Sequence, residues 1–252
     1  MSGSPGAIQL IPLLGIPAVQ PGDDLAALIR TAADLCDVQL KDGALVVCQK
    51  IVSKAEGRVV ALADVEPSEE ALQIATEDGR DPKQTELVLR ETKRIVRRGN
   101  GVLISETRHG FVCANAGLDL SNAAAPDSAV LLPIDPDASA RNLRDALIAN
   151  GAGPLAVIVS DTFGRPWRDG LVDVALGSAG IAPITDLRGD TDLVGRELEV
   201  TATATCDQLA AAAGILMQKA AGIPAVWIEG HPIEGDGTIR ETLRDPSTDL
   251  FR

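Results

Sequence analysis

Short apolar runs alternate along this chain with segments in which apolar residues recur at helical spacing. The runs predict buried strands at residues 8–13, 44–48, 59–63, 129–132, 155–159 and 224–228. The helical spacing predicts helices at residues 25–35, 67–76, 82–97, 138–149 and 206–221. Asp23 and Asp24 are well placed to cap the first helix, and we interpret the basic residues that end the third as helix-end charges.

Two further segments have patterns that are typical of antiparallel sheets. Residues 102–106 and 110–115 resemble a hairpin, and residues 197–205 alternate between apolar and polar side chains as a half-exposed strand does. These pieces favour an α+β fold, with mixed sheets and interleaved helices, over a regular doubly wound sheet. The length of 252 residues fits a single domain, 1–252, or two closely joined subdomains within it.

Composition narrows the choice of partners and compartment. The net charge of −13 repels polyanions, which argues against nucleic acid as a partner, so an anionic ligand needs local cations or a metal ion. No stretch approaches the about 20 apolar residues of a membrane span, and we expect no membrane partner. The four cysteines form no CxxC pair and only two histidines are present, which disfavours a zinc site and indicates reduced cysteines in a cytoplasmic protein.

Neither of the common nucleotide-binding fingerprints occurs: the sequence has no P-loop (GxxxxGKS or GxxxxGKT), and no Rossmann-type GxGxxG follows a predicted strand. Polar clusters follow the strands instead. In the first cluster, at 53–58, Lys54 is a suitable point charge for a phosphate, and a charged surface turn between strands is the alternative. In the second, at 115–122, Asp119 and Asn122 could share one side of a turn, or could serve only as turn and cap residues.

The third cluster is the most informative. The apolar strand that begins at residue 155 ends at Asp161 and Thr162, continues into a short loop with Arg165 and Arg168, and leads into a predicted helix of small residues. In open α/β sheets, ligands bind at the carboxyl ends of the strands. Oxygen ligands such as those of Asp119, Asp161 and Thr162 suit Mg²⁺ or Mn²⁺ bound to a phosphate. The alternative is a capped helix start whose arginines pair with nearby acidic residues at the surface.

Around these clusters the chain resembles the coenzyme F420-0:L-glutamate ligase family. The matching segments follow one another over nearly the whole chain: VSKAEGR at 52–58, ISET at 104–107, AGLDLSN at 116–122, SDTFGRPWRDGLVDVALGSAG at 160–180 and GIPAVWIEG at 222–230, after a shorter match at 11–17. Residues 244–252 resemble the junction to a flavin-binding nitroreductase-like domain of two-domain relatives, and we expect no such domain in this chain.

The resemblance implies a GTP-dependent ligase that attaches L-glutamate to the lactyl carboxylate of the deazaflavin coenzyme F420-0 and then adds gamma-linked glutamates. The implied route is an acyl phosphate, with release of GDP and phosphate. The implied cofactors are Mg²⁺ or Mn²⁺, with two divalent ions per site, and K⁺, and GTP is the co-substrate. The resemblance further implies a homodimer with an unusual α+β fold.

It also implies roles for individual residues. Asp119 and Asp161 would hold one divalent ion, and Thr162 would serve a second, whose further ligand near Gln218 and Lys219 stays open. The implied GTP contacts are Ile16, Pro17, Ala18, Val19, Gln49, Lys54 and Asn122. Gln49 stands where relatives often have serine. The expected catalytic residues are Asp161, Arg165 and Arg168, and the arginines would anchor a phosphate or a substrate carboxylate.

Two other functions stay open at this point. Catalytic motifs do not specify the acceptor, so a metal-dependent amide ligase with another acid acceptor fits the same residues. A relative that binds a nucleotide or coenzyme without turnover would also keep part of the motif. The presence of Asp119, Asn122, Asp161 and Thr162 together argues against that loss of activity.

Overall fold

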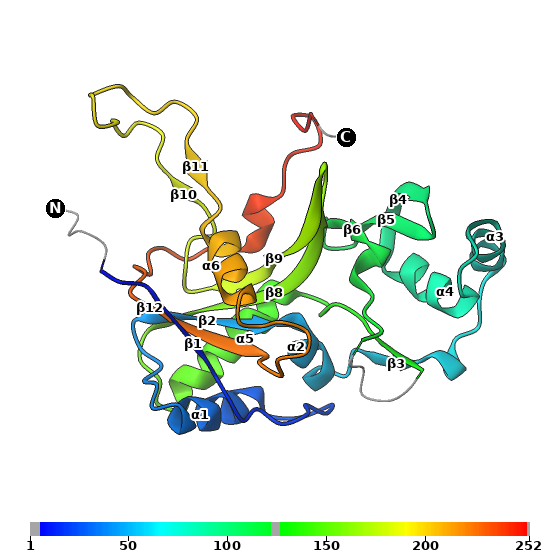
Figure 1. Ribbon diagram of the computed structural model, residues 1–252, viewed down its shortest axis with the longest axis horizontal. Coiled ribbons are helices and arrows are strands. Elements are labelled where there is room, and N and C mark those ends of the chain that lie inside the picture. The colour runs from blue at the N-terminus through cyan, green and yellow to red at the C-terminus, as the bar shows by residue number, and fades with distance from the viewer. Residues whose placement is uncertain (1–5, 122–126, 251–252) are drawn as a thin grey trace.

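The sheet at the centre of the molecule combines parallel and antiparallel strands (Figure 1). The computed structural model describes residues 6–121 and 127–250. The central sheet has five strands in the order β1 (Gln9–Pro12), β12 (Ala225–Glu229), β2 (Gly43–Cys48), β8 (Leu155–Arg165) and β9 (Arg168–Ala179). The β2–β8 pair is parallel, and the other three pairs are antiparallel. This mixed sheet with interleaved helices confirms the predicted α+β class.

Alternate side chains of the central strands face two separate hydrophobic cores. Leu45 and Val47 of β2 pack into the core beneath one set of helices, and Ala44 and Val46 pack into the other. The first set is α1 (Leu25–Leu35), α2 (Gln49–Ala55) and α5 (Pro136–Ala149), and the second is α6 (Thr205–Gly214) with the short helix η3 (Ile239–Thr242). Because both faces are covered, β2 and the first half of β8 are continuous apolar runs in the sequence.

A second region, residues 69–114, lies beside the central sheet (Figure 1). It has its own small core, which includes Ile74, Val88 and Leu103. Its elements are α3 (Glu69–Asp78), α4 (Pro82–Glu91), β4 (Thr92–Gly99), β5 (Val102–Thr107) and β6 (Val112–Ala114). The chain enters and leaves this region through β3 (Val59–Ala61), η1 (Leu62–Asp64), η2 (Asn115–Gly117) and β7 (Ser128–Val130), and β3 pairs with β7.

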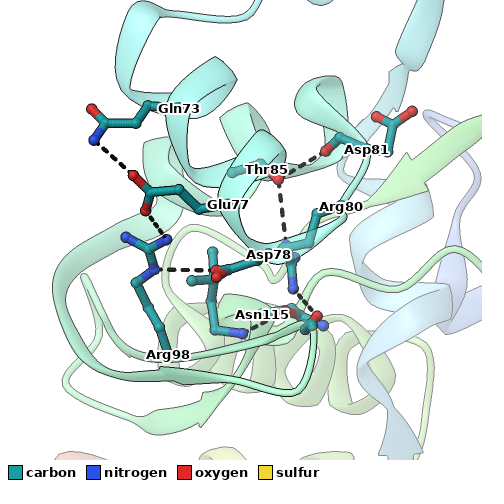
Figure 2. A network of polar contacts seen from close by, with 10 residues as sticks. Gln73, Glu77, Asp78, Arg80, Asp81, Thr85, Arg98 and Asn115 are labelled. Atoms are coloured by element: carbon teal, nitrogen blue, oxygen red, sulfur yellow. Dashed lines mark hydrogen bonds and ion pairs between the residues drawn. The ribbon is translucent and has the colours of Figure 1, made fainter.

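Charged pairs hold the end of α3 against the β4–β5 hairpin (Figure 2). Arg98 of β4 reaches Glu77 at 2.7 Å and Asp78 at 3.1 Å. Arg80, just beyond the helix, donates to the backbone oxygen of Gly101 in the hairpin turn. The two ion pairs of Arg98 and the hydrogen bond of Arg80 fix the end of α3 relative to the hairpin.

The predicted helix at 82–97 is wrong in its second half. α4 ends at Glu91, and the basic residues that follow lie on β4 rather than at a helix end. Lys93 and Arg94 pair with Glu106 of the neighbouring strand β5 at 3.0 and 2.9 Å. The partner of these cations, Glu106, lies 12 or 13 residues further along the chain. The local spacing of apolar residues does not reveal a contact at this separation.

Three other predictions are wrong in part. The predicted helix of small residues after Arg168 is strand β9, which pairs with β8 along almost its whole length. The alternative given for residues 53–58, a charged surface turn between strands, is wrong at its start, because residues 53–55 form the last turn of α2. The predicted helix at 206–221 ends at Gly214.

The predicted half-exposed strand at 197–205 is also largely wrong. It is reduced to the two residues of β11 (Ala202–Thr203), which pairs with β10 (Thr185–Asp186). The rest of the segment extends away from the central sheet, so its alternating apolar residues have no surface to cover (Figure 1). Val200, for example, is 87% exposed.

Other elements match their predictions closely. Helix α1 begins after Asp24, whose carboxylate accepts from the backbone N–H of Ala27 at 3.1 Å, and the hairpin of β5 and β6 is present. None of the helices in the described part of the chain combines the length and the apolar character needed to cross a bilayer.

Candidate active site

The parallel pair of strands places two polar segments at one edge of the central sheet. Cys48 at the end of β2 lies opposite Ser160 of β8. After these positions the chain continues into α2 on one side and to Asp161 on the other. Carboxyl ends of parallel strands meet at the same edge, so side chains from both segments face a common space.

A cavity of ≈460 Å³ occupies this edge. Eight of the predicted site residues line it: Ile16, Pro17, Ala18, Val19, Lys54, Asp119, Asp161 and Thr162. They come from four separate stretches of the sequence. Asp119 belongs to the connection that leaves the second region, and its backbone is paired with Val130 in an isolated bridge. The structure therefore brings the two predicted metal-binding carboxylates to one cavity.

Three predicted residues do not line the cavity. Gln49 is buried in α2, where its Oε1 accepts a hydrogen bond from Ser53 at 2.8 Å. Arg165 and Arg168 lie opposite each other at the tip of the β8–β9 hairpin. Arg165 donates to the backbone oxygens of Asp169 and Gly170. Asn122, another predicted contact, lies outside the described residues.

Among the ion pairs of the described residues, none joins Arg165 or Arg168 to a nearby acidic side chain, and Asp173 has another partner. The side chain of Asp173 accepts a hydrogen bond from the Thr162 hydroxyl at 2.6 Å. Because this bond joins β8 and β9 across the hairpin, it orients the predicted ligand Thr162 toward its neighbouring strand.

The two carboxylates of the site differ sharply in their electrostatics. Burial raises the pKa of Asp161 to about 7, and the negative charges of Asp119 and Asp173 act in the same direction. Its side chain keeps some contact with solvent in the cavity, while the cavity walls surround it. For Asp119, burial also favours the neutral form, but hydrogen bonds from Lys50 and Ser121 outweigh it and lower the pKa. Asp161 is therefore a carboxylate with too little positive charge around it.

Lys50 compensates the charge of Asp119. Its ammonium lies 2.8 Å from Asp119 Oδ2 and donates to the backbone oxygen of Ser121 at 2.7 Å and to its hydroxyl at 3.1 Å. The other oxygen of Asp119, Oδ1, accepts from the backbone N–H and the hydroxyl of Ser121, both at 2.7 Å. Both oxygens of the carboxylate are thus engaged.

The remaining walls are apolar or unreactive. Phe163, Met217 and Ile223 give the cavity an apolar side. Cys48 and Cys113 also line it, and burial raises the pKa of both thiols, that of Cys113 to about 12. Thiols with such pKa values stay protonated and are poor nucleophiles. The chemistry of the cavity rests on its carboxylates, hydroxyl and lysines.

The donor set fits a hard divalent cation. Among the described residues, no three His, Cys, Asp or Glu side chains are grouped as a complete metal site. Mg²⁺ commonly needs only one or two protein carboxylates, because waters and substrate phosphates complete its coordination. Asp119 and Asp161 supply two carboxylates, Thr162 a hydroxyl, and Gln218 lies in the same cavity. The under-compensated charge of Asp161 is the feature that a cation would correct.

Sequence reasoning missed Lys50. The signal was its spacing, because Lys50 and Lys54 are four residues apart and lie on the same face of a helix. The apolar run before Ser53 predicts a strand followed by a polar cluster, and such a segment gives no reason to connect the two lysines.

Comparison with known proteins agrees with the geometry. The family model described as F420-0:Gamma-glutamyl ligase matches residues 14–230. Three relatives carry the name coenzyme F420:L-glutamate ligase. That of Methanothermobacter thermautotrophicus is 47% identical and covers 97% of this chain and 99% of its own length. That of Methanopyrus kandleri is 45% identical and covers 93% of this chain and 93% of its own length. That of Archaeoglobus fulgidus is 38% identical and covers 97% of this chain and 96% of its own length. The chain therefore belongs to the F420-0:gamma-glutamyl ligase family, as its motifs predict.

Proposed function

We propose that this protein is a GTP-dependent ligase that joins L-glutamate to the lactyl carboxylate of coenzyme F420-0 and then adds gamma-linked glutamates. The ligase activity is supported by the family and by the names of its relatives. The observation that carries the proposal is that Asp119, Asp161, Lys50 and Lys54 converge on one cavity. Carboxylates that can hold a divalent ion, next to lysines that can contact phosphates, suit a metal-bound nucleoside triphosphate.

The proposed reaction has two steps. The acceptor carboxylate attacks the γ-phosphorus of GTP, the bond to the bridging oxygen breaks, and GDP leaves an acyl phosphate behind. The amine of glutamate then attacks the acyl carbon, loses a proton and displaces inorganic phosphate. Both steps join charged reactants, so the main tasks of the protein are to align them and to offset their charge.

Residues of the cavity divide these tasks. Asp119 and Asp161 would hold one Mg²⁺ or Mn²⁺ ion, and Thr162 would contribute to a second. When bound, such ions neutralise charge that develops on the transferred phosphoryl group. Gln218 lines the cavity and is a candidate for a further oxygen ligand. In this role Thr162 would turn from Asp173, whose carboxylate it contacts at 2.6 Å.

Lys54 and the loop at 16–19 would hold the nucleotide. Burial lowers the pKa of Lys54, and the neighbouring charge of Lys50 acts in the same direction. A phosphate in the cavity would reverse this effect by supplying negative charge. The loop borders the same cavity from the side of β1, where its backbone can approach the ligand.

Arg165 and Arg168 would anchor the part of a substrate that extends beyond the cavity. Thr162, Phe163 and Gly164 line the cavity and lead directly along β8 to the hairpin tip. A ligand that follows this strand would reach the guanidinium groups, which suit a carboxylate or phosphate.

We also propose a homodimer in the cytoplasm, with K⁺ as an activating ion on the strength of the family resemblance. Large apolar side chains are exposed on the hairpin tip and on the extension at 187–201: Trp167 81%, Leu171 64%, Leu193 106%, Val194 85% and Val200 87%. Exposed apolar side chains that form one patch mark protein interfaces, and the proposed dimer would bring these side chains together in such a patch. Sedimentation at micromolar concentration tests the dimer, and a monomer throughout the concentration range would contradict it.

Mass spectrometry of the products tests the activity. The protein is incubated with F420-0, L-glutamate, GTP and Mn²⁺, and we expect glutamylated F420 together with one GDP for each amide bond. ATP in place of GTP, and folate-like acids in place of F420-0, are the matched controls. Turnover only with another acid would favour the alternative amide ligase, and tight GTP binding without any turnover would favour a non-catalytic relative.

A further inference from the structure

Lys50 and Asp119 form a closed cluster with Ser121 at the wall of the cavity. The ammonium of Lys50 has three N–H groups, and three acceptors surround it: Asp119 Oδ2 at 2.8 Å, the backbone oxygen of Ser121 at 2.7 Å and its hydroxyl at 3.1 Å. The pair is only partly accessible, with 17% of the Lys50 side chain and 20% of the Asp119 side chain exposed.

This cluster conflicts with a divalent ion at the same carboxylate. An ion bound to Asp119 would lie close to the ammonium of Lys50, and the two positive charges would repel each other. Repulsion between two charges that share one carboxylate is strong away from bulk water, and salt screens it little in a partly buried site. The cation therefore has to compete with Lys50 for Asp119.

A polyphosphate would resolve this conflict. Lys50 lies one helical turn before Lys54, and both line the cavity. A phosphate group there would offer the Lys50 ammonium new anionic acceptors, so the side chain could leave Asp119 without losing its hydrogen bonds. Without phosphate, the same movement would leave a half-buried ammonium with poorer partners.

We propose that Lys50 competes with the divalent cation for Asp119 and is released by the phosphates of the nucleotide, so that cation and nucleotide bind cooperatively. This inference rests on the proposed function, because it assigns the cavity to a metal-bound polyphosphate. Lys50 acts here as a positioning residue, through Asp119. Coupling of this kind is reciprocal: the nucleotide tightens cation binding by the factor by which the cation tightens nucleotide binding.

The test is a titration with Mn²⁺, followed by the paramagnetic resonance signal of the free ion. Wild type is compared with Lys50→Met, which removes the competing charge at similar side-chain length, and with Lys50→Arg, which keeps the charge. Lys41→Met is the matched control: it removes one exposed lysine that pairs only with Asp42 among the ion pairs of the described residues. Each protein is titrated alone, with GTP, and with inorganic tripolyphosphate.

We expect Lys50→Met to bind Mn²⁺ alone about tenfold more tightly than wild type, and the gain from GTP to shrink by about the same factor. Lys41→Met should behave as wild type, and Lys50→Arg, which keeps the competing charge, should bind Mn²⁺ alone no more tightly than wild type. Lys50→Gln serves as a second neutral variant, with the same expectation, should Lys50→Met not fold.

Other outcomes separate this inference from the proposed function. Mn²⁺ binding to the neutral variants that equals or falls below wild type would overturn the inference, since Lys50 would then only support Asp119. An unchanged gain from both phosphate ligands in the neutral variants would overturn it as well. If tripolyphosphate shows the expected coupling and GTP does not, the role of Lys50 stands and GTP is removed from the proposed function.

Discussion

Two carboxylates, one in each region of the molecule, have opposite surroundings. Glu106 in the second region has a side chain that is 6% exposed, and it lies between Lys93 at 3.0 Å and Arg94 at 2.9 Å. Asp161 at the edge of the central sheet is surrounded by apolar walls and by the carboxylates of Asp119 and Asp173, and its pKa rises to about 7. Two ion pairs compensate Glu106, whereas the charge of Lys50 offsets only part of the effect of burial on Asp161.

The difference indicates what each residue is for. A buried carboxylate with two cationic partners joins strands β4 and β5 and needs nothing further. A carboxylate without such ion pairs weakens the fold when it is ionised, which makes Asp161 a candidate for binding a cation. The ion pairs of Glu106 in the second region therefore stabilise the fold, whereas the carboxylate of Asp161 in the cavity is arranged for binding.

The largest effect should come from Asp161→Asn. An amide is a much poorer ligand for Mg²⁺ or Mn²⁺ than a carboxylate, so we expect the rate of GDP release with F420-0 and glutamate to fall roughly a thousandfold. The matched control is Glu106→Gln, the same change in the second region, which should keep its rate at temperatures well below unfolding. Near-normal turnover in Asp161→Asn would remove this residue from the site.

The same variant should have the opposite effect on stability. Folding raises the pKa of Asp161 from 3.8 to about 7. Between these pH values the folded protein binds more protons than the unfolded chain, so stability falls as pH rises. The amide that replaces this carboxyl in the variant cannot ionise. In EDTA, we expect the free energy of unfolding of Asp161→Asn to exceed that of wild type by little below pH 4 and by up to about 4 kcal/mol above pH 7.

Denaturant melts at several pH values measure this difference. The excess stability should grow between pH 4 and 7 and then level off, because both states of wild type are ionised above pH 7. A constant difference over this range would show that Asp161 is ionised in the folded protein at low pH, and the contrast with Glu106 would disappear.

Glu106→Gln should lower the free energy of unfolding by about 2 kcal/mol, since it removes charged hydrogen bonds to Lys93 and Arg94. The two cations can turn to solvent, because 66% and 50% of their side chains are exposed, which limits the loss. Denaturant melts at pH 7 measure it against wild type. An increase in stability would mean that the desolvation penalty of the Glu106 carboxylate exceeds the stabilisation that Lys93 and Arg94 provide.

Much of this arrangement follows from local sequence. Helix α1 and its Asp24 cap, the central strands and the hairpin of β5 and β6 all have patterns that do not depend on distant residues. Asp119, Asp161 and Thr162 could be selected from the sequence as candidate site residues because each follows a predicted strand, and all three line the cavity. A site at the edge of β2 and β8 could be expected because carboxyl ends of neighbouring parallel strands meet, whereas Asp119 reaches this edge through the connection that leaves the second region, which the strand pattern does not predict.

The wrong predictions arise where contacts between residues far apart in the sequence determine the local structure. The small residues of β9 suggested a helix, but Gly177 is small because a side chain there would collide with the backbone of Pro136 at the start of α5. Lys93 and Arg94 continue the helical pattern of α4, yet their partner Glu106 lies on another strand. Lys50 escapes prediction for the same reason, since the whole second region lies between it and its partner Asp119 in the sequence.

The smallest effect that tests the comparison is Ser68→Ala, at the residue directly before the second region. The Ser68 hydroxyl caps α3 by accepting from the N–H of Ala71 at 3.2 Å and donates to Glu86 at 2.6 Å, which helps to lower the pKa of that carboxyl. Loss of such a cap costs about 1 kcal/mol. Ser68→Thr keeps the hydroxyl and should be close to wild type.

Denaturant melts measure the stability of Ser68→Ala, and the turnover assay measures its activity. The lowered pKa of Glu86 stabilises the folded protein above pH 4.5 and ceases to do so as the carboxyl is protonated. The difference between Ser68→Ala and wild type should therefore narrow on acidification, which is opposite to the loss of stability that Asp161 causes as pH rises. Turnover should stay unchanged, because α3 lies outside the cavity. A fall in the rate comparable to that of Asp161→Asn would show that the second region takes part in the reaction and that the two regions do not divide stability and function.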